Sequence, residues 1–271
     1  SYSPQIHAKL GTYSYSLFEK EPEELESFLK SGDYSGLNVT IPYKKEVIPF
    51  LDELSSRARM LGAVNTIVRR DGRLIGHNTD YFGFETMLSD SGISIAGKKA
   101  LVCGSGGASN TAVAVLREQG AEVVVLSRSG PDNYENLDRH ADAALIVNAT
   151  PVGMYPNVAG AAIEDLSVFP KLEGVLDLIY NPARTKLLLD AEKHGLKTEN
   201  GLKMLVAQAK ESAEWFTNAK IGNAVIDSIY RSLRGQMENV ILIGMPGCGK
   251  TTVGQLLSRR LGKKFLDADT V

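Results

Sequence analysis

The sequence predicts an α/β protein whose middle part is a doubly wound parallel sheet. Three observations predict it. From Lys98 onward, short and almost entirely apolar runs recur at 100–103, 121–126, 144–148 and 174–179. Such runs are typical of parallel strands that are buried on both faces. A glycine-rich turn, residues 104–108, follows the first run, and an amphipathic helix is expected at 108–119, before the second run. The order strand, tight turn, helix, strand is that of a nucleotide-binding α/β unit of the Rossmann type.

The N-terminal 90 residues mix helical and extended signals. Pro22 and the acidic residues around it favour a helix start, and Leu25, Phe28 and Leu29 supply its apolar stripe. We expect a strand at 36–41, a helix between Pro42 and Pro49, and a hairpin over 63–78 with Asp71-Gly72 at its turn.

The C-terminal part begins with two expected helices, at 202–216 and 221–233, followed by a linker at 235–239. A second glycine loop then occupies 244–251. We expect a strand at 240–243 before it, a helix at 252–261 after it, and a strand ending near the carboxylates of Asp267 and Asp269.

The bulk composition excludes several classes of protein. The chain has 271 residues, a net charge of −2 and a pI of about 6.1, so it lacks the basic surface of a nucleic-acid-binding protein. Two cysteines give no disulfide framework, and no apolar run approaches the roughly 20 residues of a membrane span. These observations favour a cytoplasmic protein whose partners are small molecules and not nucleic acid or a membrane. We expect a monomer or homodimer. The start at Ser1 predicts an N-terminal truncation.

The first glycine loop suggests a dinucleotide site, because amide groups at a helix N-terminus bind phosphate. An enzyme that uses NAD often carries an acidic residue after the second strand, where this chain has Ser127-Arg128-Ser129. A guanidinium between two hydroxyls suits a 2′-phosphate, which favours NADP. The alternative is that Arg128 is a solvated charge at a strand end.

Two charged residues, Lys44 and Asp80, stand in polar motifs at the ends of expected elements. Each is by itself most simply a surface charge. Together with Thr40 and Asn65 they place polar groups where strands and helices end, and such groups often build a site.

The chain resembles shikimate dehydrogenase over residues 1 to about 234. Seven segments carry the resemblance and stand in the family's order. They are Ser1-Tyr2-Ser3-Pro4, Asn38-Val39-Thr40-Ile41-Pro42-Tyr43-Lys44, Gly62-Ala63-Val64-Asn65-Thr66, Asn78-Thr79-Asp80, Gly104-Ser105-Gly106-Gly107-Ala108, Asn148-Ala149-Thr150-Pro151 and Gly201-Leu202-Lys203-Met204-Leu205-Val206-Ala207-Gln208-Ala209.

The resemblance implies NADP-linked interconversion of 3-dehydroshikimate and shikimate in aromatic amino-acid and chorismate biosynthesis, with Lys44 and Asp80 as the catalytic pair. The substrate would meet Ser1, Ser3, Thr40, Lys44, Asn65, Asp80, Tyr180 and Gln208. The cofactor would meet Gly104, Ser105, Gly106, Gly107, Ala108, Ser127, Arg128, Ser129, Leu178, Gly201 and Met204. Without the motif, Met204 would be interpreted as a core residue.

The resemblance also implies three domains: a substrate domain at 1–90, completed by C-terminal helices at about 203–234; a Rossmann domain at 91–202; and a kinase-like segment at 237–271. The substrate domain would lack the family's first strand. Three alternatives stay open: a quinate/shikimate dehydrogenase using NAD, a cofactor-binding fragment without turnover, and a nucleotide-sensing segment.

The second loop matches the Walker A pattern and resembles the start of a shikimate kinase, so the chain would be part of a bifunctional fusion. Its Gly244, Gly247, Gly249, Lys250 and Thr251 would bind ATP, and Thr251 with Asp267 would hold Mg²⁺ in a complete kinase domain. Because only twenty residues follow Thr251, we expect this segment to be inactive as a kinase.

Overall fold

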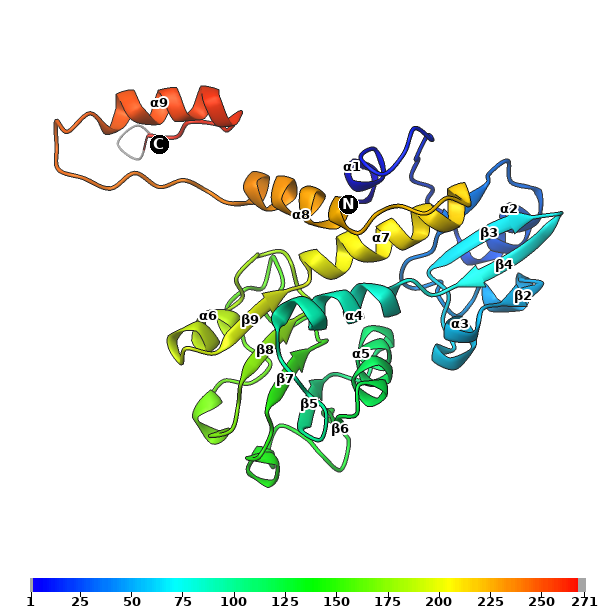
Figure 1. The fold of residues 1–271 in the computed structure, drawn as a ribbon, viewed down its shortest axis with the longest axis horizontal. Coiled ribbons are helices and arrows are strands. Elements are labelled where there is room, and N and C mark those ends of the chain that lie inside the picture. The colour runs from blue at the N-terminus through cyan, green and yellow to red at the C-terminus, as the bar shows by residue number, and fades with distance from the viewer. Residues whose placement is uncertain (1, 268–271) are drawn as a thin grey trace. The chain divides into compact units, whose positions relative to one another are not determined.

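A computed structural model describes residues 2–267, in a chain that divides into two compact units, 1–230 and 231–271. The first unit contains two separate sheets (Figure 1). The four-stranded sheet has the order β1-β3-β4-β2, and the five-stranded sheet has the order β6-β5-β7-β8-β9.

The smaller sheet is built around the predicted hairpin. Its strands are β1 (Gly36–Asn38), β2 (Glu53–Leu54), β3 (Thr66–Arg70) and β4 (Arg73–His77). At the turn, Asp71 and Gly72 both have positive φ, as a type I′ turn requires. Two short helices, α2 (Leu25–Ser31) and α3 (Ser56–Leu61), pack on this sheet, whereas α1 (Ser3–His7) packs on the helix α7 (Leu202–Thr217) described below. Leu29, Val47 and Ile67 are among the residues of the core under this sheet.

The expected helix between Pro42 and Pro49 is wrong. Successive hydrogen-bonded turns, in which Tyr43 N donates to Thr40 O and Val47 N to Tyr43 O, lead into a 3₁₀ helix at Ile48–Phe50. The stretch between the two prolines is too short for a stable helix, and Pro42 has no N–H to contribute. The strand before it also ends early, at Asn38, although Val39 N still donates to Asn65 O.

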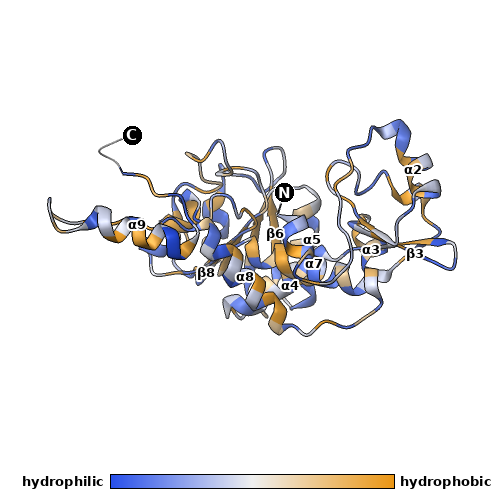
Figure 2. Cartoon of the chain, turned by 90° about the horizontal axis from the view of Figure 1, so that it is seen from above, coloured by the Kyte–Doolittle hydropathy of each residue, from blue (hydrophilic) through white to orange (hydrophobic). Residues whose placement is uncertain are grey.

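The five-stranded sheet confirms the predicted Rossmann architecture, since all its strands are parallel. Its strands are β5 (Lys99–Cys103), β6 (Glu122–Leu126), β7 (Leu145–Asn148), β8 (Gly174–Asp177) and β9 (Lys197–Asn200). Alternate residues of β5 belong to different cores, Ala100 and Val102 to one and Leu101 and Cys103 to the other. Both faces are therefore covered, which explains the unbroken apolar runs (Figure 2).

Strand β9 has no counterpart in the prediction, because its sequence, Lys-Thr-Glu-Asn, is polar. It lies at the edge of the sheet, where polar residues are common. Helices α5 (Gly107–Glu118) and α6 (Lys186–Lys193) contribute side chains to the two different cores.

Two long helices, α4 (Asp80–Ser91) and α7 (Leu202–Thr217), lie side by side between the two sheets (Figure 1). They touch closely at Gly83, where an added Cβ would be 2.7 Å from Met204 O and 3.1 Å from Gln208 Cβ. This contact brings the start of α4, with Asp80, next to the predicted ligand-binding face of α7.

The division between the units falls within α8 (Ala224–Met237). This helix begins three residues later than predicted and continues through residues 235–237, which we expected to be part of a linker. The second unit contains α9 (Lys250–Leu261), as expected. The strands expected at 240–243 and up to 267 are wrong within the described residues. A strand needs a partner to receive its hydrogen bonds, and here Ile241 and Ile243 are 79% and 93% exposed. Asp269 lies outside the described residues. No helix in the range 2–267 is long and apolar enough to cross a membrane.

Candidate active site

The structure brings Lys44 and Asp80 together although they are 36 positions apart in the sequence. Lys44 Nζ lies 2.6 Å from Asp80 Oδ2, and the two side chains are 28% and 16% exposed. An ammonium group held by a carboxylate and still reachable from solvent can give or accept a proton at a substrate oxygen.

Backbone and amide hydrogen bonds fix both residues. Val64 N donates to Lys44 O at 2.8 Å, which ties the Lys44 turn to the segment that precedes β3. Asp80 is the first residue of α4, where the helix dipole favours a negative charge. The Asn78 side chain accepts from Asp80 N and donates to Ala63 O. The two motifs are thus joined independently of the ion pair.

Asn65 and Gln208, two predicted substrate residues, meet at Thr79. Asn65 Oδ1 accepts from Thr79 N at 2.8 Å, and Asn65 Nδ2 donates to Thr79 Oγ1 at 3.1 Å. Thr79 Oγ1 also lies 3.5 Å from Gln208 Oε1. Asn65 and Thr79 are buried next to Asp80, so the amides and the ion pair occupy one region.

The other predicted substrate residues lie at the N-terminal segment, at the turn before Lys44 and in the loop after β8. Ser3 hydrogen-bonds Tyr15, and the ring of neighbouring Tyr2 packs edge-on against Tyr180, 6.0 Å away. Burial raises the pKa of Tyr180, which keeps it a neutral hydroxyl. Thr40 is exposed. Ser1 lies outside the described residues.

The predicted cofactor residues gather at the carboxyl edge of the five-stranded sheet. Gly104 follows β5 with φ of 101°, and its N–H donates to Leu126 O, which places Ser127, Arg128 and Ser129 beside the loop. An added Cβ on Gly106 or Gly107 would meet no described atom within 4 Å. The loop thus leaves open space before the first turn of α5, whose amide groups lack helical partners. This fits a phosphate.

Leu178, Gly201 and Met204 lie together at the next part of this edge. A Cβ on Gly201 would be 2.0 Å from Leu178 O, so only glycine allows this approach. Met204 is half-buried one turn into α7 and packs partly against the core. Below them, Asp177 is fully buried and accepts from Thr185, Asn148 and Ile179 N. Burial raises its pKa, against the effect of these hydrogen bonds.

The second glycine loop stands before α9 with its lysine folded back. Lys250 Nζ donates to Gly244 O at 2.8 Å and to Met245 O at 2.9 Å. Gly247 and Gly249 both have positive φ, which the tight turn requires. Thr251 donates to Asp267 at 3.2 Å, so the two residues expected at a Mg²⁺ site are adjacent.

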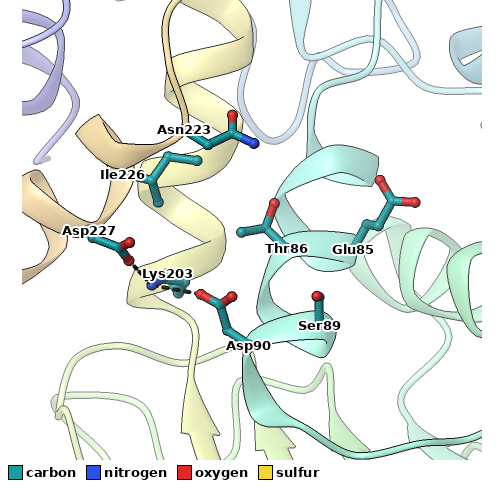
Figure 3. A pocket seen from close by; sticks show the side chains of 8 residues that line it. All are labelled: Glu85, Thr86, Ser89, Asp90, Lys203, Asn223, Ile226 and Asp227. Carbon is teal, nitrogen blue, oxygen red and sulfur yellow. Dashed lines mark hydrogen bonds and ion pairs between the residues drawn. The ribbon is translucent and has the colours of Figure 1, made fainter.

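A hollow of about 280 Å³ lies apart from these residues, between α4, α7 and the start of α8 (Figure 3). Lys203 lies between Asp90 and Asp227 in it and forms ion pairs with both. All three charges are thus engaged with one another, and the hollow contains none of the predicted site residues. We regard it as a feature of the helix packing.

Comparison with known proteins gives the family. Residues 1–67 match the family model described as the shikimate dehydrogenase substrate binding domain. The NADP(+) shikimate dehydrogenase of Clostridium perfringens is 35% identical over 256 residues, covering 86% of this chain and 94% of that protein. The chain belongs to the shikimate dehydrogenase family.

Solved shikimate dehydrogenase structures share the fold. A chorismate mutase/shikimate 5-dehydrogenase fusion protein from Clostridium acetobutylicum has a TM-score of 0.83 and 35% identity, covering 88% of this chain and 94% of that one. The Thermus thermophilus enzyme in complex with NADP(H) and shikimate has a TM-score of 0.73 and 31% identity, covering 85% and 94%. Residues 246–271 match the shikimate kinase family model, as the second glycine loop predicted.

Several residues of the site were missed from the sequence. Each of four residues hydrogen-bonds a predicted substrate residue: Tyr15 with Ser3, Asn38 and Thr66 with Asn65, and Ser212 with Gln208. Asn38 and Thr66 stand inside the recognised motifs, which is the signal that could have drawn attention to them. Ser212 lies on α7 beside Ala209 and Ala213 and looks like one more small residue of a helix interface.

Proposed function

We propose that this chain catalyses the reversible, NADP-dependent reduction of 3-dehydroshikimate to shikimate. The observation that carries the proposal is the 2.6 Å contact between Lys44 and Asp80, next to the buried amide of Asn65. Family membership supports the reaction class. NADP would supply the hydride, and Gly104–Ala108 with Ser127–Ser129 would hold it.

In this proposal Lys44 carries the proton at Nζ. During reduction it donates that proton to the carbonyl oxygen, where negative charge develops, and during oxidation it accepts the proton from the hydroxyl. Asp80 orients the ammonium group. The amides of Asn65 and Gln208 and the hydroxyls of Ser3, Thr40 and Tyr180 bind the polar groups of the ring, since a polyol needs many hydrogen-bond partners.

The test is an NADP-coupled assay with shikimate on the wild-type chain and on Lys44→Ala. We expect kcat to fall by roughly 10²–10⁴-fold, the usual contribution of a positioned acid or base. The exposed neighbour Lys45 supplies a matched control, and Lys45→Ala should keep wild-type activity. A Lys44→Ala protein with wild-type kcat would refute the assignment.

The choice of substrate and cofactor is part of the same proposal. Initial rates with shikimate and quinate, each with NADP and NAD, separate it from a quinate/shikimate dehydrogenase. Cofactor binding without turnover would instead favour the non-catalytic alternative.

The assignment of domains is also a proposal: a substrate domain at 1–90 with helices from about 203–234, a cofactor domain at 91–202 and a kinase-like segment at 237–271. For that last segment we propose that Lys250 binds phosphate and that Thr251 and Asp267 take Mg²⁺ in a complete kinase. We expect no kinase activity from these 271 residues. ATP-dependent phosphorylation of shikimate by this chain would contradict that expectation.

A further inference from the structure

Ser212 is a fully buried hydroxyl at the centre of the polar network beside the proposed substrate site. Its Oγ lies 2.8 Å from Thr66 Oγ1, 3.0 Å from Thr79 Oγ1, 2.9 Å from Asn38 Nδ2 and 3.0 Å from Gln208 O. These partners come from β1, β3, the segment before α4, and α7 itself. One side chain therefore joins four segments of the chain.

The chemistry of the partners fixes which way these bonds run. Gln208 O can only accept, so the single hydroxyl hydrogen of Ser212 is directed to it. Asn38 Nδ2 can only donate, so it uses one Ser212 lone pair. Because Thr66 Oγ1 gives its single hydrogen to Asn65 Oδ1, Thr79 Oγ1 donates to the remaining lone pair. In Ser212→Ala a hydrogen atom replaces the hydroxyl, which would remove an acceptor from two donors at once.

The same logic orients Asn65. Its Oδ1 already accepts from Thr79 N at 2.8 Å and from Thr66 Oγ1 at 3.2 Å. Its Nδ2 donates one hydrogen to Thr79 Oγ1, so the second N–H is the group that Asn65 can offer to a ligand oxygen. Gln208 is oriented in turn, because its Nε2 donates to Leu205 O at 2.9 Å and its backbone carbonyl accepts from Ser212.

The network also reaches the N-terminal segment. Asn38 Oδ1 accepts from Tyr15 at 3.2 Å, and Tyr15 hydrogen-bonds Ser3. His7 stacks on the Tyr15 ring at 4.1 Å and holds it in place. Ser212 is thus linked to Ser3 as well as to Asn65 and Gln208.

We propose that Ser212 is a positioning residue that sets the affinity and hydroxyl selectivity of the substrate site, acting through Asn65, Gln208 and the Tyr15–Ser3 link. The proposal rests on the proposed function for the identity of the substrate. It assigns to Asn65 the role of N–H donor toward a ring hydroxyl oxygen. Ser212 itself touches neither substrate nor cofactor.

Ser212→Ala tests the proposal through the balance between KM and kcat. We expect KM for shikimate to rise about tenfold, on the order of one to two lost or misdirected hydrogen bonds. We expect kcat and KM for NADP to change less than about twofold, because an interaction made equally in ground and transition states affects KM alone. A shikimate analogue lacking one non-reacting hydroxyl should lose less affinity in the variant than in the wild type.

Two controls separate this role from general damage. Thr217 lies on the same helix and its hydroxyl makes the same kind of bond, to Ala213 O at 2.8 Å, so Thr217→Ala should leave all constants unchanged. The single tryptophan, Trp215, stacks on His77 at 3.7 Å and lies one turn from Ser212. Its emission spectrum reports whether the variant is packed normally. Should Ser212→Ala not fold, Ser212→Cys keeps the size but bonds weakly, and it should show the same rise in KM.

Calorimetric titration with shikimate makes the two proposals separable. A wild-type chain that binds shikimate but does not turn it over refutes the proposed function, while the loss of affinity in Ser212→Ala still supports its positioning role. A folded Ser212→Ala with wild-type affinity overturns the positioning role alone. An equal fall in kcat and in affinity for both ligands would also overturn it, since that pattern indicates general disruption. Failure of the wild type to bind shikimate at all overturns both.

Discussion

Gly83→Ala should disable the site without touching a proposed catalytic group. The new Cβ would lie 2.7 Å from Met204 O, and ordinary contact begins at 3.4 Å, so α4 and α7 would have to separate by roughly 0.7 Å. Overpacking of this kind typically costs about 1–3 kcal/mol of stability. Asp80 is on α4 and Gln208 is on α7, so the same shift would displace the ion pair from the substrate-binding amide. Misplacement by about 1 Å can cost about 10²-fold in rate.

The assay combines urea unfolding with steady-state kinetics in the shikimate direction. The matched control is Gly235→Ala in α8, where the added Cβ meets no described atom within 4 Å. Alanine should stabilise that position by up to about 1 kcal/mol and leave the kinetics unchanged. If Gly83→Ala keeps both wild-type stability and wild-type kcat, the close contact between α4 and α7 does not position the site.

Three further predictions concern charged groups. Burial, opposed by the Arg57 guanidinium 3.4 Å away, raises the pKa of Glu211 to about 7 from an unfolded value of 4.5. The free energy of unfolding should therefore fall by up to about 3 kcal/mol as pH rises through this range. In urea unfolding, Glu211→Gln should show a weaker dependence of stability on pH, and the same dependence as the wild type would contradict this. Lys210 and Glu214 form a buried ion pair at 2.9 Å, so Lys210→Met should lower the free energy of unfolding by about 3–5 kcal/mol. In thermal melts, the double variant with Glu214→Leu should recover most of that stability. If the effects of the two substitutions on stability simply add, the pair is not coupled. Arg128→Ala should raise KM for NADP at least about tenfold and leave KM for NAD unchanged, because it removes a charge-assisted hydrogen bond to the 2′-phosphate. An equal rise in KM for both cofactors would argue against that contact.

The sequence was most informative where local pattern and tertiary structure agree. Strands β5 and β7 could be predicted because burial on both faces makes all their residues apolar except Lys99 and Asn148, which stand at strand ends. The hairpin turn could be predicted because Asp71-Gly72 tolerates positive φ. Both are local signals, and both are confirmed.

The rest depends on contacts that no local pattern contains. The turns around Lys44 replace a helix because two prolines bound the segment and Val47 is anchored in the core. Residues 240–243 have strand composition but no strand partner among the described residues. Ser212 was missed because a small residue near Ala209 and Ala213 gives no sign that it accepts hydrogen bonds from residues more than a hundred positions away.

The hydrogen bond from Val64 N to Lys44 O has a consequence for motion. A run of turns that lacks regular helical hydrogen bonds would ordinarily fluctuate independently of the sheet. Here its midpoint is tethered to the residue immediately before Asn65, so the ammonium group and the amide should be displaced together when the backbone moves. The distance between the Lys44 ammonium group and the Asn65 amide should therefore vary less than is usual for a residue in an irregular segment. This suits a reaction in which both groups must contact one small ring.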